Sequence, residues 1–347
     1  MRRLASLMLY TATLIFFGSQ VSFAQKPHSA KPAEATKTPA GSKANAALDK
    51  DSINNADMAL QADTSEPSPL LIKAQVLLDR EHASPGVIDG RSGDNMGKAI
   101  VAFETTNNLP LAPQLNNTLW AALTANQKAP VLVDYDITDK DVAGPYTPVI
   151  PTDYGELAKL THLDYRNVSE MLAERFHMDE RLLTALNPGA DFAKAGTHIL
   201  VANVATQPLK ANIAKIVVDK EMGQVRAIDE QGKLIVAYPA TVGSEELPSP
   251  SGDYKVKGVA WRPTYSYNPQ KNFQQGNNKK KLTIGSGPNN PVGTVFIALT
   301  KPTYGIHGTP DPSKIDKTAS HGCVRLTNWN AEELAHMVRF GLPVHFQ

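Results

Sequence analysis

The chain has little cysteine and almost no excess charge. Cys323 is the one cysteine among 347 residues, so neither an intrachain disulfide nor a cysteine-based zinc site can form. Lys and Arg number 35 against 34 Asp and Glu, which gives no global electrostatic reason to expect a nucleic-acid partner. The nine histidines form no His-x-x-x-His pair of the zinc-binding kind, so we expect no metal and no cofactor. Specificity must come from local sites.

Long apolar runs are also absent, apart from one near the N-terminus. Two arginines precede an apolar run from Leu4 to Phe17, and small residues ending at Ala24 supply a cleavage site. We therefore interpret residues 1–24 as a secretory signal peptide. A retained anchor is the alternative, although the run is short against the roughly 20 residues that span a bilayer. The sequence predicts export, with no membrane span after cleavage.

The next segments change from polar to helical character. Residues 25–69 are rich in Ala, Lys, Ser, Thr and Pro, and we expect a disordered tether there. Apolar residues at helical spacing begin at Leu70, and three short helices are expected within residues 70–126. The turn at Gly86–Gly93 resembles that of the three-helix peptidoglycan-binding repeat. An unrelated helical bundle is the alternative, because its Asp-Gly is also an ordinary turn.

A Pro-rich stretch separates this helical segment from the next pattern. Helices are expected at Val168–Phe176 and Asp179–Leu186, followed by Asn187-Pro188-Gly189 and a strand at His198–Val201. This order resembles the second half of a LysM module, a small βααβ glycan binder, which we place at residues 152–205. The Gly-Asp-Thr opening of that family is missing, so a degenerate spacer is the alternative.

Residues 212–347 have a predominantly β pattern, with short runs divided by Gly, Pro and Asn turns. One helix is expected near the end, with Asn330 as its N-cap, Glu333 in a capping box and Gly341 after its last turn. Together these features predict a mainly β sandwich or barrel. We expect strands at 215–218, 225–228, 234–242, 253–261, 294–299 and 343–346.

The residues that carry chemistry lie in two short segments of this domain. Cys323 ends the run Ser320-His321-Gly322-Cys323, and His307 lies upstream. A nucleophilic cysteine needs a base or a positive neighbour to lower its pKa from about 8.5, and a folded-back strand brings His307 to it. The Gly322 turn allows backbone N–H groups to converge on an oxyanion. The pattern indicates acyl transfer, with a buried structural cysteine as the alternative.

This pattern resembles the signature of the L,D-transpeptidase catalytic domain, the YkuD family, over about residues 213–346. Twelve residues separate His307 from Ser320, and Pro250–Tyr254 and Gly287–Gly293 are similar to two further segments of the family. The resemblance implies a sandwich- or barrel-like β fold preceded by the helical bundle and the LysM-like module.

The resemblance also implies roles for five catalytic residues. Cys323 attacks the substrate, and His307 is the base. The carbonyl of Gly308 orients the His307 ring. His321 shapes the site, and the N–H of Gly322 stabilises the oxyanion.

Three further residues are expected to contact substrate: Arg325, Tyr304 and Ser320. Arg325 stands where other members of the family have Asn. Its guanidinium pairs either with a substrate carboxylate or with a neighbouring acid, and the sequence leaves both readings open.

The implied reaction is ping-pong acyl transfer on peptidoglycan stem peptides in the periplasm. The Cys323 thiolate takes a tetrapeptide stem as a thioester and releases D-Ala. A diaminopimelate amine then gives a 3→3 cross-link, a lysine of an outer-membrane lipoprotein gives anchoring, and water gives carboxypeptidase activity. The rivals are a hydrolase of the same fold that cuts cross-links or lipoprotein links, and a non-catalytic wall-binding protein.

Overall fold

The structure is a computed structural model that describes residues 48–347, except for 60–65, 205–208, 245–246, 272, 319 and 321. The expected signal peptide and most of the expected tether lie outside the described residues, as does His321. All described residues belong to one compact unit, Asn45–Gln347. Within the part of the chain so described, no helix is both long and apolar enough to cross a membrane.

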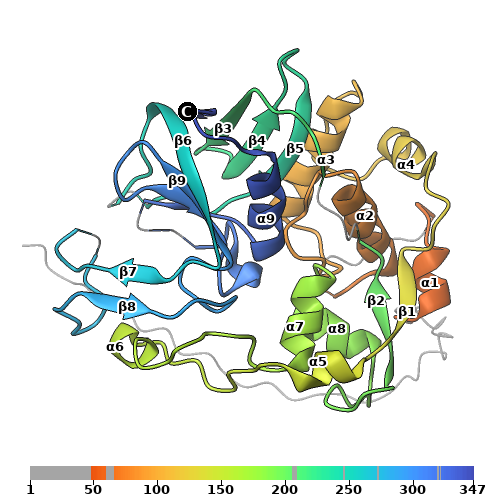
Figure 1. Ribbon diagram of the computed structural model, residues 1–347. Coiled ribbons are helices and arrows are strands. Elements are labelled where there is room, and N and C mark those ends of the chain that lie inside the picture. The colour runs from red at the N-terminus through yellow and green to blue at the C-terminus, as the bar shows by residue number, and fades with distance from the viewer. Residues whose placement is uncertain are drawn as a thin grey trace, which may run out of the picture. The chain divides into compact units, whose positions relative to one another are not determined.

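The C-terminal part is built on one eight-stranded sheet, in the order β11-β10-β9-β6-β12-β3-β4-β5 (Figure 1). The pairs β10–β11 and β3–β12 are parallel, and the other neighbours are antiparallel. This arrangement confirms the mainly β architecture that the sequence predicts for residues 212–347. The strands are β3 (Lys215–Asp219), β4 (Gln224–Ile228), β5 (Leu234–Pro239), β6 (Gly252–Trp261), β9 (Val295–Leu299), β10 (Gly305–His307), β11 (Val324–Arg325) and β12 (Pro343–Phe346).

Helix α9 (Asn328–Met337) packs on this sheet, and its cap differs from the prediction. Thr327 is the N-cap, because its hydroxyl accepts a hydrogen bond from the Asn330 N–H at 3.3 Å. The predicted cap, Asn330, lies inside the helix and is buried. Glu333 makes no capping box, since its carboxylate accepts the Tyr238 hydroxyl at 2.8 Å. Polar side chains of α9 therefore serve tertiary contacts.

A small hairpin stands apart from the main sheet. It consists of β7 (Tyr265–Tyr267) and β8 (Leu282–Ile284), which pair antiparallel. The short helix α6 (Tyr154–Leu157) lies beside β8 (Figure 1). We call residues 144–163, which include α6, the strap. Leu163 closes it with a 2.8 Å hydrogen bond from its N–H to the Ser286 carbonyl.

Four helices precede these elements: α1 (Lys50–Asn54), α2 (Pro69–Arg80), α3 (Asp94–Thr106) and α4 (Asn117–Thr124). Helix α1 corrects the prediction that residues 25–69 form a tether throughout. Asp49 and Ser52 form a capping box at its start, and Ile53 is fully buried. A short capped helix with one buried isoleucine thus folds within a mainly polar segment.

Two strands flank the next helices. β1 (Leu132–Asp136) pairs antiparallel with β2 (His198–Ala202), and between them lie α5 (Asp139–Ala143), the strap, α7 (Val168–Arg175) and α8 (Glu180–Leu186). We call residues 132–202 the β1–β2 unit. The sequence places the start of the LysM-like module at residue 152, but β1, which pairs with β2, lies before that position. The strap separates β1 from α7 in the chain. The Pro-rich stretch therefore lies between two strands that pair with each other.

The helical part continues the edge of the main sheet. The Ser84 N–H donates to the Ala237 carbonyl of β5 at 3.0 Å, and the Ala237 N–H donates to the His82 carbonyl at 3.1 Å. His177, which follows α7, stacks on Trp329 of α9 with ring centroids 4.9 Å apart. These contacts place α7 beside α9, next to the strands that carry the candidate site.

Candidate active site

The parallel pair β10–β11 brings the two sequence-predicted catalytic segments together. Ile306 lies opposite Val324, and His307 lies opposite Arg325. Ile306 and Val324 are fully buried in the core, so the alternate residues project to the other face. His307, Arg325 and Cys323 share that face and line one cavity. The predicted pairing of the histidine strand with the cysteine strand is therefore present.

His307 is buried and held in one orientation. Its Nδ1 lies 2.7 Å from the Gly308 carbonyl, a bond in which only a protonated Nδ1 can donate. Phe296 stacks on the ring at a centroid distance of 5.7 Å. Burial, with the nearby Arg325 charge, lowers the pKa of His307 to about 3. The neutral ring therefore has Nε2 as its proton acceptor at neutral pH.

The Cys323 thiol is also kept neutral. Its Sγ lies 3.6 Å from the Thr303 carbonyl. Burial raises the pKa of Cys323, and the Gly305 backbone and the Arg325 charge only partly oppose that rise. A buried neutral imidazole supplies no positive charge, so these shifts do not support the expected lowering of the Cys323 pKa by His307. Both shifts favour the neutral forms of the two side chains.

The loop before the cysteine is tied by internal hydrogen bonds. The Ser320 hydroxyl donates to the Cys323 carbonyl at 2.5 Å and accepts from the Gly322 N–H at 3.1 Å. The Gly322 carbonyl accepts from the Ser249 hydroxyl at 2.9 Å. Ser320 is buried, so its hydroxyl shapes the loop in this structure. The Gly322 N–H, expected to face the oxyanion, is here directed at Ser320.

Tyr304 lies against this loop, as a substrate-facing residue would. A Cβ on Gly322, whose φ is +110°, would come within 3.0 Å of the Tyr304 ring. The Lys301 ammonium lies 4.7 Å from the centroid of that ring. Glycine at 322 thus allows the ring to approach the backbone beside the thiol.

The segment Gly287–Gly293 packs against the backbone that follows His307. Gly293 has a φ of +62°, and a Cβ there would lie 2.7 Å from the Gly308 backbone. Asn290 stabilises the turn, with its amide donating to the Gly285 carbonyl at 2.6 Å and its oxygen accepting the Val292 N–H at 2.8 Å. This close approach explains why the sequence places glycine there.

The cavity at Cys323 has a volume of about 760 Å³ and aromatic walls. Tyr265 and Phe273 of the hairpin region line it, together with Tyr154 of the strap. Tyr154 packs edge-on against Tyr265, Tyr267 and Phe273 at centroid distances of 5.9, 5.2 and 6.0 Å. Sequence reasoning missed all four, because no local pattern connects residue 154 with residues 265–273.

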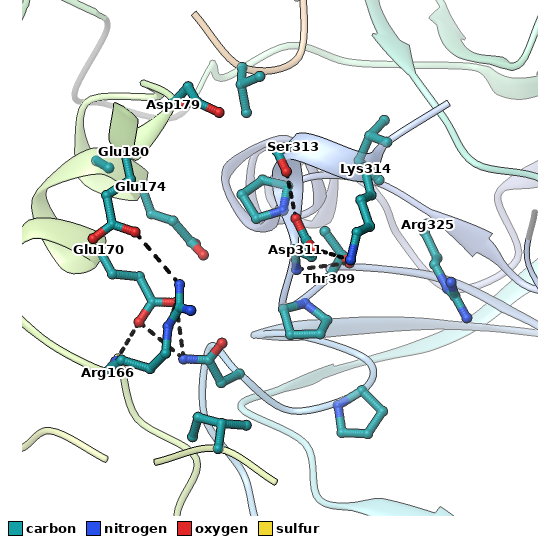
Figure 2. Close-up of a pocket in the computed structure, with 18 of the residues that line it drawn as sticks. Arg166, Glu170, Glu174, Asp179, Glu180, Thr309, Asp311, Ser313, Lys314 and Arg325 are labelled. Atoms are coloured by element: carbon teal, nitrogen blue, oxygen red, sulfur yellow. Dashed lines mark hydrogen bonds and ion pairs between the residues drawn. The ribbon is translucent and has the colours of Figure 1, made fainter. Parts of the chain in front are cut away.

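A second cavity of about 690 Å³ adjoins the first (Figure 2). Tyr154, Pro291 and Arg325 line both cavities, and α7 and α8 supply one wall of the second. In Figure 2 the ion pairs of this wall, such as Arg166 with Glu170, face the Asp311–Lys314 pair across the cavity.

Arg325 lies at the boundary of the two cavities. No acidic side chain within the described part of the chain pairs with its guanidinium, and no dashed line reaches it in Figure 2. The sequence left open whether Arg325 pairs with a substrate carboxylate or with a neighbouring acidic residue. The described residues provide no such acidic partner. The same residues contain no group of three His, Cys, Asp or Glu side chains placed to hold a metal ion.

Comparison with known proteins is consistent with this geometry. Residues 214–345 match the family model of the YkuD L,D-transpeptidase catalytic domain. The protein named YkuD in Bacillus licheniformis is 28% identical over 180 residues, which are 50% of this chain and 90% of that protein. YkuD of Bacillus subtilis is 31% identical over 112 residues, 32% of this chain and 53% of that protein.

Solved L,D-transpeptidase structures also show similarity to part of this chain. L,D-transpeptidase 3 from Mycobacterium tuberculosis, solved with a faropenem-derived adduct, is 18% identical over 43% of this chain and 67% of that chain, with a TM-score of 0.33. An L,D-transpeptidase from Xylanimonas cellulosilytica is 14% identical over 81% of this chain and 95% of that chain, with a TM-score of 0.35.

These matches concern the C-terminal part. Residues 214–345 are similar to L,D-transpeptidase catalytic domains. The match supports an enzyme of the L,D-transpeptidase class. The matched region begins after the β1–β2 unit, so the family model does not describe the strap or α7.

Proposed function

We propose that the protein is a peptidoglycan L,D-transpeptidase in which Cys323 is the nucleophile and His307 the base. The observation that supports this most is the β10–β11 pairing, which puts both side chains on one face while the Gly308 carbonyl holds Nδ1. A neutral His307 accepts the thiol proton at Nε2 as Sγ attacks the donor carbonyl. The substrate is the tetrapeptide stem of peptidoglycan.

The proposed first half-reaction forms a thioester. The C–N bond to the terminal D-Ala breaks, and the proton held by His307 goes to the leaving amine. An incoming amine then attacks the thioester carbonyl and gives its proton to His307, which returns it to the departing thiolate. Each cycle therefore exchanges one amide for another and restores the neutral pair. The 3→3 cross-link and lipoprotein attachment differ only in the amine.

Arg325 is proposed to bind a substrate carboxylate. It lines both cavities, and its guanidinium has the planar donors that a carboxylate accepts. Tyr304 is proposed to pack against the donor stem beside the thiol. His321 lies outside the described residues, and its loop-shaping role stays a proposal, as do the substrate contact of Ser320 and the oxyanion role of Gly322.

The N-terminal residues are proposed to export the protein and to keep it at the wall. Export rests on the apolar run of residues 4–17, and wall binding rests on the peptidoglycan-binding and LysM-like patterns. The test uses Cys323→Ala protein and insoluble peptidoglycan in the presence of excess soluble tetrapeptide. Retention under these conditions supports wall binding by the modules, and full release refutes it.

The test of the reaction uses purified protein, tetrapeptide muropeptides and mass spectrometry. A covalent adduct on Cys323, release of D-Ala and a new cross-linked dimer are expected. Release of D-Ala without a dimer indicates carboxypeptidase action, and conversion of dimers to monomers indicates a hydrolase. Absence of any adduct or product removes the catalytic assignment.

A further inference from the structure

Asn328 connects the catalytic base to the β1–β2 unit. It is the first residue of α9, it is buried, and its side-chain amide has four partners. Its Oδ1 accepts from the Thr294 N–H at 3.2 Å and from the Thr309 N–H at 3.1 Å. Its Nδ2 donates to Glu174 Oε2 at 2.9 Å and to the Pro288 carbonyl at 3.3 Å. The amide is fully used.

The Asn328 oxygen is packed directly against Gly308. A Cβ on Gly308 would lie 2.2 Å from Asn328 Oδ1, and one on Gly293 would lie 2.1 Å from it. The Gly308 carbonyl accepts the His307 Nδ1 proton, and the next peptide N–H, that of Thr309, donates to Asn328. The amide of Asn328 therefore fixes the peptide that selects the tautomer of the base.

Glu174 is the one side chain among the contacts that orient that amide. Exchanging the amide oxygen and nitrogen of Asn328 would turn two N–H donors toward the N–H groups of Thr294 and Thr309. Glu174, buried on α7, accepts from Nδ2 and so favours the orientation that holds the loop. α7 lies outside the region that matches the family model.

Burial keeps Glu174 uncharged. Desolvation raises its pKa to about 8, the hydrogen bond from Asn328 opposes the rise, and the carboxylates of Glu170 and Glu332 add to it. Glu170 lies on the same helix and Glu332 on α9, while Arg166 and Tyr165 face the group from the segment before α7. The carbonyl oxygen of a neutral carboxyl suffices to accept the amide proton.

We propose that Glu174 and Asn328 are positioning residues for the catalytic base: Glu174 orients the Asn328 amide, and Asn328 fixes the Gly308–Thr309 backbone that holds His307 with its proton on Nδ1. This inference rests on the proposed function, in which His307 accepts the thiol proton at Nε2. It makes the β1–β2 unit a structural part of the active site, in addition to any role in wall binding.

The experiment measures Cys323 acylation by a tetrapeptide donor in full-length variants. Glu174→Gln keeps an acceptor oxygen and is expected to acylate within about 2-fold of the original rate. Glu174→Met has similar length without an acceptor, and a loss of about 5- to 20-fold is expected. Asn328→Ala removes both links, and a loss of about 100-fold is expected, the scale of a small misplacement of a catalytic group.

Two measurements separate positioning from mere stability. The ring ¹⁵N chemical shifts of His307 report its tautomer and are expected to move in Glu174→Met and not in Glu174→Gln. The matched control is Ser84→Ala, which removes a buried 3.0 Å hydrogen bond to Asn330 on the same helix without touching the Gly308 loop. It is expected to lower the melting temperature and leave the acylation rate unchanged.

The outcomes divide cleanly. If Glu174→Met acylates as fast as Glu174→Gln, or if Ser84→Ala loses as much activity as Glu174→Met, the positioning role is wrong. If Asn328→Ala does not fold, the Glu174 pair and the ¹⁵N shifts decide. If the unmodified protein is never acylated, the proposed function fails first, which is a separate result.

Discussion

The two walls of the catalytic cavity differ in where they lie in the sequence. One wall comes from β10, β11 and the loop before Cys323, all within residues 304–325. The other comes from the strap and the hairpin, where Tyr154 contacts Tyr265 from more than a hundred positions away. The first wall carries the atoms that react, and the second shapes the space around them. The candidate reactive residues therefore come from one short stretch of the sequence, whereas the shape of the cavity depends on contacts between distant segments.

The largest effect is expected on the first wall. Cys323→Ala and Cys323→Ser should abolish acyl-enzyme formation, because the thiol is the group that forms the thioester. The fold should persist, since Cys323 is only half-buried and no disulfide depends on it. Intact-mass spectrometry after incubation with a carbapenem or a tetrapeptide checks this. A covalent adduct on either variant would show that another residue reacts.

A somewhat smaller effect is expected for the base. His307→Ala should lower the acylation rate by about 10²- to 10⁴-fold, the usual contribution of a general base. In His307→Ala, the pH at which thiol alkylation is half-maximal should stay above that of free cysteine. It should differ little from that of the original protein. Burial raises the pKa of Cys323, and His307, with a pKa lowered to about 3, is uncharged above that pH. Its removal therefore takes no positive charge from the thiol.

Iodoacetamide labelling between pH 6 and 10 measures this midpoint, with His345→Ala on β12 as the control. A midpoint that rises clearly in the His307 variant alone would mean that the resting pair is thiolate and imidazolium, and the neutral-pair description would be wrong.

The sequence predicts the first wall far better than the second. The β pattern locates β3, β4, β6, β9 and β12 to within about two residues, because alternation and turn residues are local signals. The alternation does not show β10 and β11, since three and two residues are too short for a period, and their pairing was expected from the positions of His307 and Cys323 instead. The cysteine and histidine were still identifiable, because their spacing follows the family signature.

Other misses have tertiary causes. The cap of α9 was placed on Asn330, which is buried and accepts a hydrogen bond from Ser84 at a distance of 246 positions in the chain. The lowered thiol pKa was inferred from residue types, whereas burial of Cys323 favours a raised pKa. The contact of Tyr154 with the hairpin has no sequence signal at all. Each depends on which groups the folded chain excludes from water.

Arg325 lies on the first wall and lines both cavities, and an intermediate effect is expected there. Arg325→Met should lower kcat/KM for a tetrapeptide donor by about 10- to 100-fold, the scale of one charge-assisted hydrogen bond to a carboxylate. Arg325→Lys keeps the charge without the planar guanidinium, and its kcat/KM should lie between those of the original protein and Arg325→Met. The comparison uses donors with free and amidated carboxylates. Equal losses with both donors would exclude carboxylate recognition.

The smallest effect is expected at Tyr154, which belongs to the strap and lines both cavities. Tyr154→Ala removes the ring that packs on Tyr265, Tyr267 and Phe273, so the two cavities merge and water gains access to the thioester. Acylation by a carbapenem, which is a small donor, should change by less than about 3-fold. The ratio of amide product to hydrolysis product should fall severalfold, because water competes better with the amine in an open site. Tyr154→Phe keeps the ring and should keep the ratio.

Quantifying both products by mass spectrometry from one acyl-enzyme preparation tests this prediction. An unchanged ratio of amide product to hydrolysis product in Tyr154→Ala would mean that the strap does not control access of water to the thioester.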